Sequence, residues 1–151
     1  MIDLSILANQ KALVAPIAAQ YALDPVLVCA VCEQESAWNA GDVRFEPGFL
    51  KEYVLKLNLP DLVALDRATS WGLMQIMGQT AVELGYVGLP SNLRDPATGV
   101  QFGCKKLAKC MDLHPGDLNA ALEAYNGGGK PDGWHPATYA AEVQARMSQY
   151  F

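Results

Sequence analysis

The chain has 151 residues, of which 51% are hydrophobic, so it is long enough for one domain with a buried core and too short for two ordinary domains. It carries 11 basic and 16 acidic residues, a net charge of -5, and its longest basic run is Lys105-Lys106. This charge pattern argues against nucleic acid as a partner, because nucleic-acid-binding surfaces need clustered positive charge. We therefore predict a single domain over residues 1–151.

The N-terminal segment is predicted to be an amphipathic helix over about residues 3–21, disturbed near Pro16. Its apolar residues recur at helical spacing: Leu4, Leu7, Ala8, Ala12 and Ala15. Polar residues interrupt the apolar stretches and no basic segment precedes them, so no secretory signal is predicted. No stretch approaches the roughly twenty consecutive apolar residues that span a bilayer. We expect a protein made in the cytoplasm without a signal peptide and without a membrane span.

A second helix is predicted to begin at Asp24-Pro25, which is typical of an N-cap followed by proline in the first turn. The apolar run that follows predicts a helix buried almost all round and ending near Glu35. Glu35 lies between this run and the polar string 36–39, where an apolar wall would favour a protonated carboxyl group. A protonated Glu is a candidate general acid. On this segment alone, a solvated helix end is the more common interpretation.

The rest of the chain is also predicted to be helical. Glu46-Pro47 begins a helix with one apolar side, formed by Phe49, Leu50, Tyr53, Val54 and Leu57, and a short helical turn is predicted over 61–67. Further helices are predicted near 77–84, 97–111, 118–124 and 136–150. No alternating strand pattern is present, so we predict an all-α globule.

The chain has four cysteines, at positions 29, 32, 104 and 110. The spacing of Cys29 and Cys32 is compatible with a zinc or redox site. Both lie among Val and Ala in a predicted core helix, and neither His114 nor His135 stands at a familiar ligand spacing. Buried free thiols are therefore the favoured interpretation, and no metal is predicted.

Two later segments present polar groups beside glycines. Gly72 permits close approach by a ligand or another backbone, and it is followed by the apolar Met74 and the amide of Gln75. The helix over 118–124 is stopped by a run of glycines, which places Tyr125 and Asn126 on its last turn. A phenol and an amide are thus presented at a loop.

Three blocks in this order resemble the signature blocks of the soluble lytic transglycosylase family: Glu35-Ser36, Gly72-Leu73-Met74-Gln75 and Ala124-Tyr125-Asn126. The resemblance covers about residues 24–147, with Tyr139 matching a late tyrosine of the family. Several blocks in the right order are more specific than one short motif. The resemblance implies a single-domain, all-α, lysozyme-like helical globule, related to goose-type lysozyme, with a substrate groove.

The resemblance also implies a reaction. Glu35 is the sole acid/base that cleaves the β-1,4 bond after N-acetylmuramic acid in peptidoglycan glycan strands. It protonates the leaving oxygen and then accepts a proton from the 6-hydroxyl of the same sugar, which leaves a 1,6-anhydromuramoyl end. One carboxyl group suffices because the nucleophile is part of the substrate. No metal or organic cofactor is implied.

The family's other site residues carry over as a substrate-binding set: Ser36, Gly72, Met74, Gln75, Tyr125, Asn126 and Tyr139. Ser36 orients the carboxyl group or the substrate, although a hydroxyl bonded to backbone at a helix end is equally compatible. Met74 and Gln75 line the floor of the groove, with core packing an even alternative for Met74. Tyr125 holds Glu35, Asn126 caps the turn or contacts sugar, and Tyr139 forms part of the wall.

One departure from the family pattern concerns the connection between the first two blocks. Gly72 follows Glu35 by 37 positions, where the family commonly has a much shorter connection. The extra stretch, about residues 40–68, is expected to form a wall of the groove or a lid. It contains Glu46, a possible second carboxylate that would weaken the lyase assignment if it reached the groove.

The nearest alternative function is a goose-type lysozyme that hydrolyses the same bond. Hydrolysis wants a second carboxylate to activate water, roughly 6.5 to 9.5 Å from the first in an inverting enzyme. Glu46, Asp42 and Asp66 are the candidates. Glu33 is a rival for the role of Glu35, but residues two apart on a helix are separated by about 200° and cannot share a face. A third alternative is a non-catalytic glycan-binding protein of a virion.

Three tryptophans flank the blocks, and indole faces suit the apolar faces of sugar rings. We expect at least one of Trp38, Trp71 and Trp134 to contact glycan, while core or rim packing is favoured for Trp38 and Trp134 individually.

Without a signal, the protein would need release or delivery to reach the cell wall. This fits a bacteriophage endolysin or virion component, or else the mature part of a secreted bacterial enzyme. Nothing in the sequence requires a dimer, and we expect a monomer.

Overall fold

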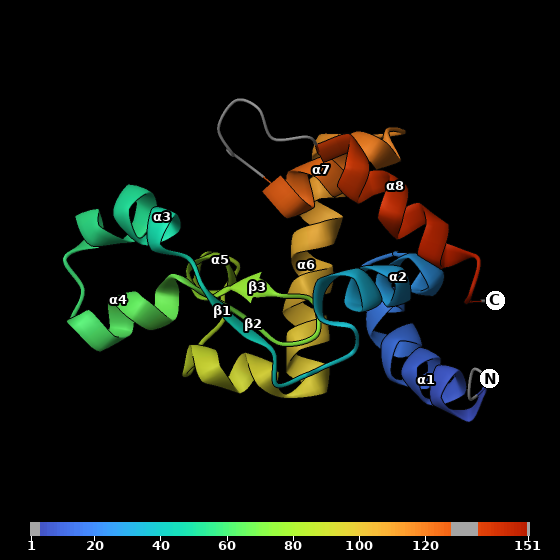
Figure 1. The fold of residues 1–151 in the computed structure, drawn as a ribbon, viewed down its shortest axis with the longest axis horizontal. Coiled ribbons are helices and arrows are strands. Elements are labelled where there is room, and N and C mark those ends of the chain that lie inside the picture. Colours follow the sequence, from blue (N-terminus) through green and yellow to red (C-terminus); the bar gives the residue numbers. More distant parts are fainter. Residues whose placement is uncertain (1–3, 128–135, 151) are drawn as a thin grey trace. The chain divides into compact units, whose positions relative to one another are not determined.

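A computed structural model describes residues 4–127 and 136–150 of the chain. Most of these residues are helical and a small three-stranded sheet completes the fold, so the predicted lysozyme-like helical class is confirmed. The elements in chain order are α1 Leu4–Gln20, α2 Pro25–Ser36, β1 Val43–Phe45, α3 Pro47–Phe49, the π-helix η1 Leu50–Val54, the 3₁₀ helix η2 Leu55–Leu57, α4 Asp61–Arg67, β2 Thr69–Trp71, β3 Ile76–Met77, α5 Gly78–Glu83, the 3₁₀ helix η3 Pro90–Arg94, α6 Pro96–Leu113, α7 Leu118–Gly127 and α8 Pro136–Met147 (Figure 1).

The chain forms two compact units. The first unit contains residues 1–34 and 104–151, and the second contains residues 35–103. The prediction of one domain over the whole chain stays a prediction.

Within the described part of the first unit, all the regular elements are helices. α1 continues through Pro16, and α2 begins at Pro25, where the carboxylate of Asp24 accepts a hydrogen bond from the Val26 amide at 2.9 Å. The predicted N-cap is thus confirmed. Residues 27–32 of α2 are all buried, as the apolar run predicted, and α7 packs against α8 (Figure 1).

The second unit contains the sheet, in the order β1-β2-β3 with both pairs antiparallel. The predicted helical globule thus contains a small sheet that the sequence analysis did not predict. Each strand is only two or three residues long, too short for an alternating pattern to be recognised. Trp71 and Ile76 of the sheet pack with Ala81 and Leu93 in one apolar cluster.

The stretch between β1 and β2 is helical, as predicted, but not regular. The helix that begins at Pro47 changes from α to π and then to 3₁₀ before Asn58, whose φ of 53° ends it. α4 then returns the chain to β2, and its bounds match the prediction for 61–67. Val54, Ala64 and Ala68 form a second small apolar cluster beneath these helices.

A close backbone approach joins the Gly72 loop to η3. Gly72 has a φ of 77°, and a Cβ atom added there would lie 2.4 Å from the carbonyl oxygen of Leu93. A Cβ atom added at Gly99, in α6, would lie 2.6 Å from the same oxygen. The Leu93 carbonyl therefore fits between two positions that only glycine can occupy without displacing backbone.

The four cysteines are free and buried, which confirms the interpretation of Cys29 and Cys32 as buried thiols. Burial raises the pKa of the Cys29 thiol to about 11 and that of Cys104 to about 12. Over residues 4–127 and 136–150, no three His, Cys, Asp or Glu side chains gather in a group that could hold a metal ion.

Among the described residues no single helix is long and apolar enough to cross a membrane. α1 and α2 taken together have the length and composition, but the chain bends by 118° between them.

Replacing Gly72 with alanine should lower the free energy of unfolding by about 3 kcal/mol, because the new Cβ combines a left-handed φ with a backbone clash. The matched control is Gly116→Ala, where φ is 73° but no atom lies within 4 Å of the added Cβ. There we expect a loss of about 1 kcal/mol from the φ alone. Urea unfolding of both variants measures the difference, and equal losses would contradict the clash.

The thiols should be nearly inert in the native state. At pH 8, iodoacetamide should label the folded chain far more slowly than the chain unfolded in urea, because only the thiolate reacts. The folded-state pKa of Cys29 lies above its ordinary value of 9.0, so the folded chain holds this proton more tightly. Stability should consequently fall as pH rises from about 9 toward 11. Mass spectrometry counts the labels, and rapid labelling of the folded chain would refute the prediction.

Candidate active site

The end of α2 carries the first two residues of the predicted site. Residues 27–32 of this helix are buried, and Glu35 and Ser36 are its last two residues. Glu35 is half-buried there and Ser36 is buried. Glu35 thus belongs neither to the dry core nor to a fully exposed surface.

Ser36 joins this helix end to the second predicted block. Its Oγ donates a buried hydrogen bond of 2.8 Å to the carbonyl oxygen of Leu73. The bond connects residues 37 positions apart in the chain. The structure therefore brings Glu35-Ser36 and the Gly72–Gln75 block together, and it gives Ser36 the backbone-bonding role that was one of its two interpretations.

The chain turns sharply directly after Ser36. Ala37 and Trp38 have φ values of 48° and 63°, and the Asn39 amide donates to the Ser36 carbonyl at 2.9 Å. Two consecutive non-glycine residues in the left-handed region cost conformational energy, and such strain is common at functional sites. The turn ends α2 at Ser36 and redirects the chain toward β1.

The loop from Gly72 to Gln75 is closed by the Gln75 side chain. Gln75 has a φ of 48°, and its Nε2 donates to the carbonyl oxygens of Asp42 and Gly72 at 3.0 and 2.9 Å. The Gly72 amide in turn donates to the Asp42 carbonyl at 2.9 Å. Within the described residues, both side-chain hydrogen bonds of Gln75 use its nitrogen, which leaves its oxygen as the acceptor for a ligand.

Met74 lies inside the second unit. Its side chain is fully buried, and a Cβ atom added at Gly103 would lie 2.4 Å from the Met74 sulfur. The thioether therefore packs on the bare backbone of α6. This is the core packing that the sequence left as an even alternative to a place on the groove floor.

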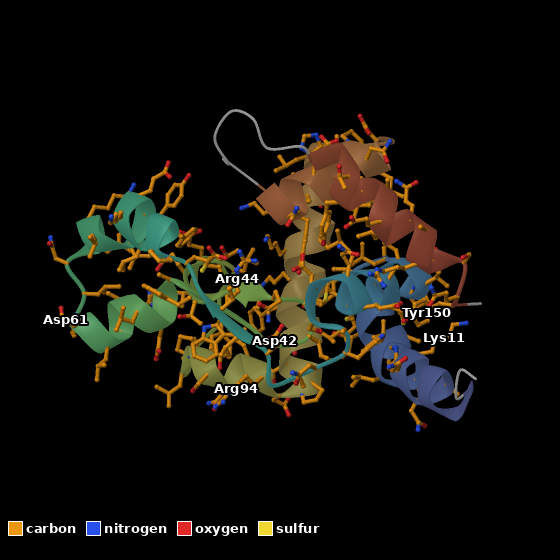
Figure 2. The ribbon with its side chains drawn as sticks, in the orientation of Figure 1. Lys11, Asp42, Arg44, Asp61, Arg94 and Tyr150 are labelled. Carbon is orange, nitrogen blue, oxygen red and sulfur yellow. The ribbon has the colours of Figure 1, made fainter. Side chains whose placement is uncertain are left out.

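Glu33 is engaged elsewhere. Its two carboxylate oxygens accept hydrogen bonds from Arg146 Nη1 at 2.9 Å and from the Tyr150 hydroxyl at 2.7 Å. Tyr150 is labelled in Figure 2 beyond the end of α8. These contacts give Glu33 a structural role in the first unit and leave Glu35 as the carboxylate of the helix end.

The third predicted block belongs to the first unit. Tyr125 is buried on α7, Asn126 is half-buried beside it, and Tyr139 is buried on α8. Lys106 Nζ donates to the Tyr125 carbonyl at 2.7 Å and lies 4.2 Å from the centre of the Tyr125 ring. The predicted contacts of this block with Glu35 and with sugar stay predictions.

The three candidates for a second carboxylate differ in their surroundings. Glu46 Oε1 forms an ion pair with Arg44 Nε at 3.0 Å. Asp42 and Asp66 are half-buried, and their backbone carbonyls accept bonds from the Gly72 amide and the Trp71 indole. Figure 2 labels Asp42 and Arg44 on the segment that forms β1.

The tryptophans have distinct environments. Trp71 is buried, and its indole N–H donates to the Asp66 carbonyl at 3.1 Å, so this side chain packs in the core of the second unit. Trp38 is half-buried at the strained turn after α2. Trp134 lies outside the described residues. Contact of Trp38 or Trp134 with glycan stays a prediction.

Sequence reasoning missed several contributors. The Leu73 carbonyl, which anchors Ser36, is a backbone group and leaves no trace in residue identity. Arg44, which pairs with Glu46, and Lys106, which lies over Tyr125, were not among the predicted site residues. A surface depression of about 290 Å³ on α7 and α8 is lined by Asn119, Glu123, Ala141 and Gln144, and it contains none of the predicted site residues.

Comparison with known proteins places the chain in a family. Residues 13–145 match the model of the transglycosylase SLT domain, a wider span than the predicted 24–147 at its N-terminal end. The chain is also 32% identical, over 135 residues, to a protein of Enterobacteria phage PRD1 named "Transglycosylase"; the alignment covers 88% of this chain and 41% of that protein. The chain thus spans about two fifths of the length of this relative. The chain belongs to the transglycosylase SLT domain family.

Proposed function

We propose that the chain is a peptidoglycan lytic transglycosylase that cleaves the β-1,4 bond between N-acetylmuramic acid and N-acetylglucosamine and leaves 1,6-anhydromuramoyl ends. The observation that carries the proposal is the buried hydrogen bond from Ser36 to the Leu73 carbonyl. It holds the helix end that bears Glu35 against the Gly72–Gln75 loop, as a single acid/base next to a substrate-binding loop requires.

In the proposed mechanism Glu35 acts twice. Its protonated carboxyl group gives a proton to the leaving glycosidic oxygen, and the resulting carboxylate then accepts the proton of the muramoyl 6-hydroxyl as that oxygen attacks the anomeric carbon. The glycosidic bond breaks, the anhydro bond forms, and Glu35 ends protonated as it began. The internal nucleophile replaces water and lowers the entropic cost of attack.

The ion pair of Glu46 favours this route over hydrolysis. A carboxylate that activates water must be available to that water, whereas Glu46 Oε1 is held by Arg44 at 3.0 Å. Hydrolysis by a goose-type lysozyme mechanism is therefore the second candidate. A glycan-binding protein without catalysis is the third, and the loop contacts around Glu35 argue against it.

The other predicted residues have proposed roles in binding. The free acceptor of Gln75 suits a sugar hydroxyl or the N–H of an N-acetyl group. Tyr125 is proposed to hold Glu35 in place, while Asn126 and Tyr139 contact the glycan. We further propose that the protein acts as a monomer on the cell wall. We also propose that it is encoded by a bacteriophage, since a relative of this chain is a phage protein.

The catalytic role of Glu35 can be tested by digesting purified peptidoglycan and analysing the muropeptides by mass spectrometry. The parent chain should release products one water lighter than those of a lysozyme, and Glu35→Gln should lower their rate by at least about a thousandfold. Glu46→Gln is the matched control and should retain most of the activity. Reducing ends that disappear in Glu46→Gln would make the chain a hydrolase, and the absence of any product would favour the binding protein.

The role of Ser36 as a positioning residue can be tested by Ser36→Ala. The change leaves the buried Leu73 carbonyl without its donor and should lower the free energy of unfolding by about 1–3 kcal/mol. It should also lower kcat about tenfold with little change in KM, because Glu35 loses its fixed position. Thr69→Ala removes a hydroxyl-to-carbonyl bond of equal length, 2.8 Å, at a more exposed site. We expect less than about 1 kcal/mol there, and equal effects of the two variants would refute the prediction.

A further inference from the structure

Strand β1 has an open edge. It lies at one end of the sheet order β1-β2-β3 and pairs only with β2, with Val43 opposite Trp71, Arg44 opposite Ser70 and Phe45 opposite Thr69. All three of its residues are exposed. An exposed edge strand presents backbone groups that can pair with another extended chain.

The ladder contacts show which groups face outward. The Glu46 amide donates to Ala68 and the Gly72 amide to Asp42, both at 2.9 Å and both in the register of the β1–β2 pair. Even-numbered residues of this segment thus bond to β2, and the N–H and C=O groups of Val43 and Phe45 point to the outer edge. Within residues 4–127 and 136–150, nothing pairs with these four groups.

The side chains of the edge are mixed in character. Val43 and Phe45 lie on one face of the strand and are 48% and 44% exposed. Arg44 lies on the other face with 75% of its side chain exposed, and only its Nε is engaged by Glu46. The edge therefore offers two apolar contacts and a cation with further free donors.

The edge begins at the candidate active site. The Asp42 carbonyl, one residue before β1, accepts hydrogen bonds from the Gly72 amide and from Gln75 Nε2. The same loop holds Ser36 through Leu73. All of these residues belong to the second unit, so β1 follows directly on the residue that contacts the Gly72–Gln75 loop.

We propose that the outer edge of β1 binds the peptide stem of peptidoglycan by strand addition, with the amides of the stem pairing with the N–H and C=O groups of Val43 and Phe45. This inference rests on the proposed function, since it adds a peptide subsite to a glycan-cleaving enzyme. The charge and shape of the edge fit such a stem: its carboxylates suit Arg44, and its alanine methyl groups suit the exposed apolar face.

An extended peptide fits the edge better than the glycan does. The outward groups of Val43 and Phe45 recur every second residue, roughly 7 Å apart along the strand, which is the spacing of amides in another extended backbone. Paired donors and acceptors of this kind are satisfied by strand addition, whereas sugar hydroxyls have no such repeat.

The test compares Phe45→Pro with Phe45→Ala. Proline removes the outward N–H of residue 45 and keeps the hydrogen bonds that its neighbours make to β2. Edge strands tolerate proline at such a position, and the extended backbone of Arg44 is compatible with a proline after it. Alanine removes the ring and keeps the N–H. Rates of anhydro-product release are measured on peptidoglycan with intact stems and on glycan strands freed of peptide by an amidase.

The selectivity is the rate on peptidoglycan with intact stems divided by the rate on peptide-free strands. It should fall about five- to tenfold in Phe45→Pro and about twofold in Phe45→Ala. Equal falls on both substrates would mean that the edge binds glycan or shapes the site, and an unchanged selectivity would mean that it binds no stem. Either result overturns the inference. Anhydro product from peptide-free strands with the parent chain tests the proposed function separately.

Hydrogen exchange of the parent chain gives a second measurement that needs no variant and no activity. A synthetic stem tetrapeptide should slow exchange at the Val43 and Phe45 amides. Unchanged exchange at saturating peptide would overturn the inference. Protection that appears without peptide and grows with protein concentration would also overturn it, because a second copy of the chain would then occupy the edge.

Discussion

The second unit is built around the close packing of the Leu93 carbonyl group. This group fits between Gly72 and Gly99, at distances that exclude a Cβ atom on either residue. This contact fixes how closely the Gly72 loop packs on α6 and η3. The Leu73 carbonyl of the same loop accepts the hydrogen bond from Ser36 at 2.8 Å. The helix end that carries Glu35 is therefore joined, through Ser36 and the Gly72 loop, to a close approach of backbone to backbone.

Much of the fold followed from local patterns. The apolar run after Asp24-Pro25 begins with a capping residue and is long enough to define a helix, and the short helix over 61–67 also formed as predicted. The three strands did not follow, since pairing of two or three residues depends on long-range partners. The change from α to π and 3₁₀ geometry over 47–57 likewise has no signal in side-chain spacing.

The site was predictable to a different degree. Residue identity and order selected Glu35 and the Gly72–Gln75 block, and helical rotation separated Glu33 from Glu35. The structure adds the reason for that separation, because Arg146 and Tyr150 occupy both oxygens of Glu33. The contact from Ser36 to the loop was beyond the sequence, since its acceptor is a main-chain carbonyl.

The long connection between the first two blocks explains why an open edge exists in this chain. After α2 the chain forms β1, leaves the sheet through the helices over 47–67, and returns as β2, so β1 has a partner on one side only. A three-residue strand with an exposed Arg44–Glu46 pair is poorly suited to self-association, because short length and charge both blunt edge-to-edge pairing. The same edge still has two outward amides, directly after the Asp42 contact with the Gly72–Gln75 loop, and two amides suit the short peptide segment proposed above better than another sheet.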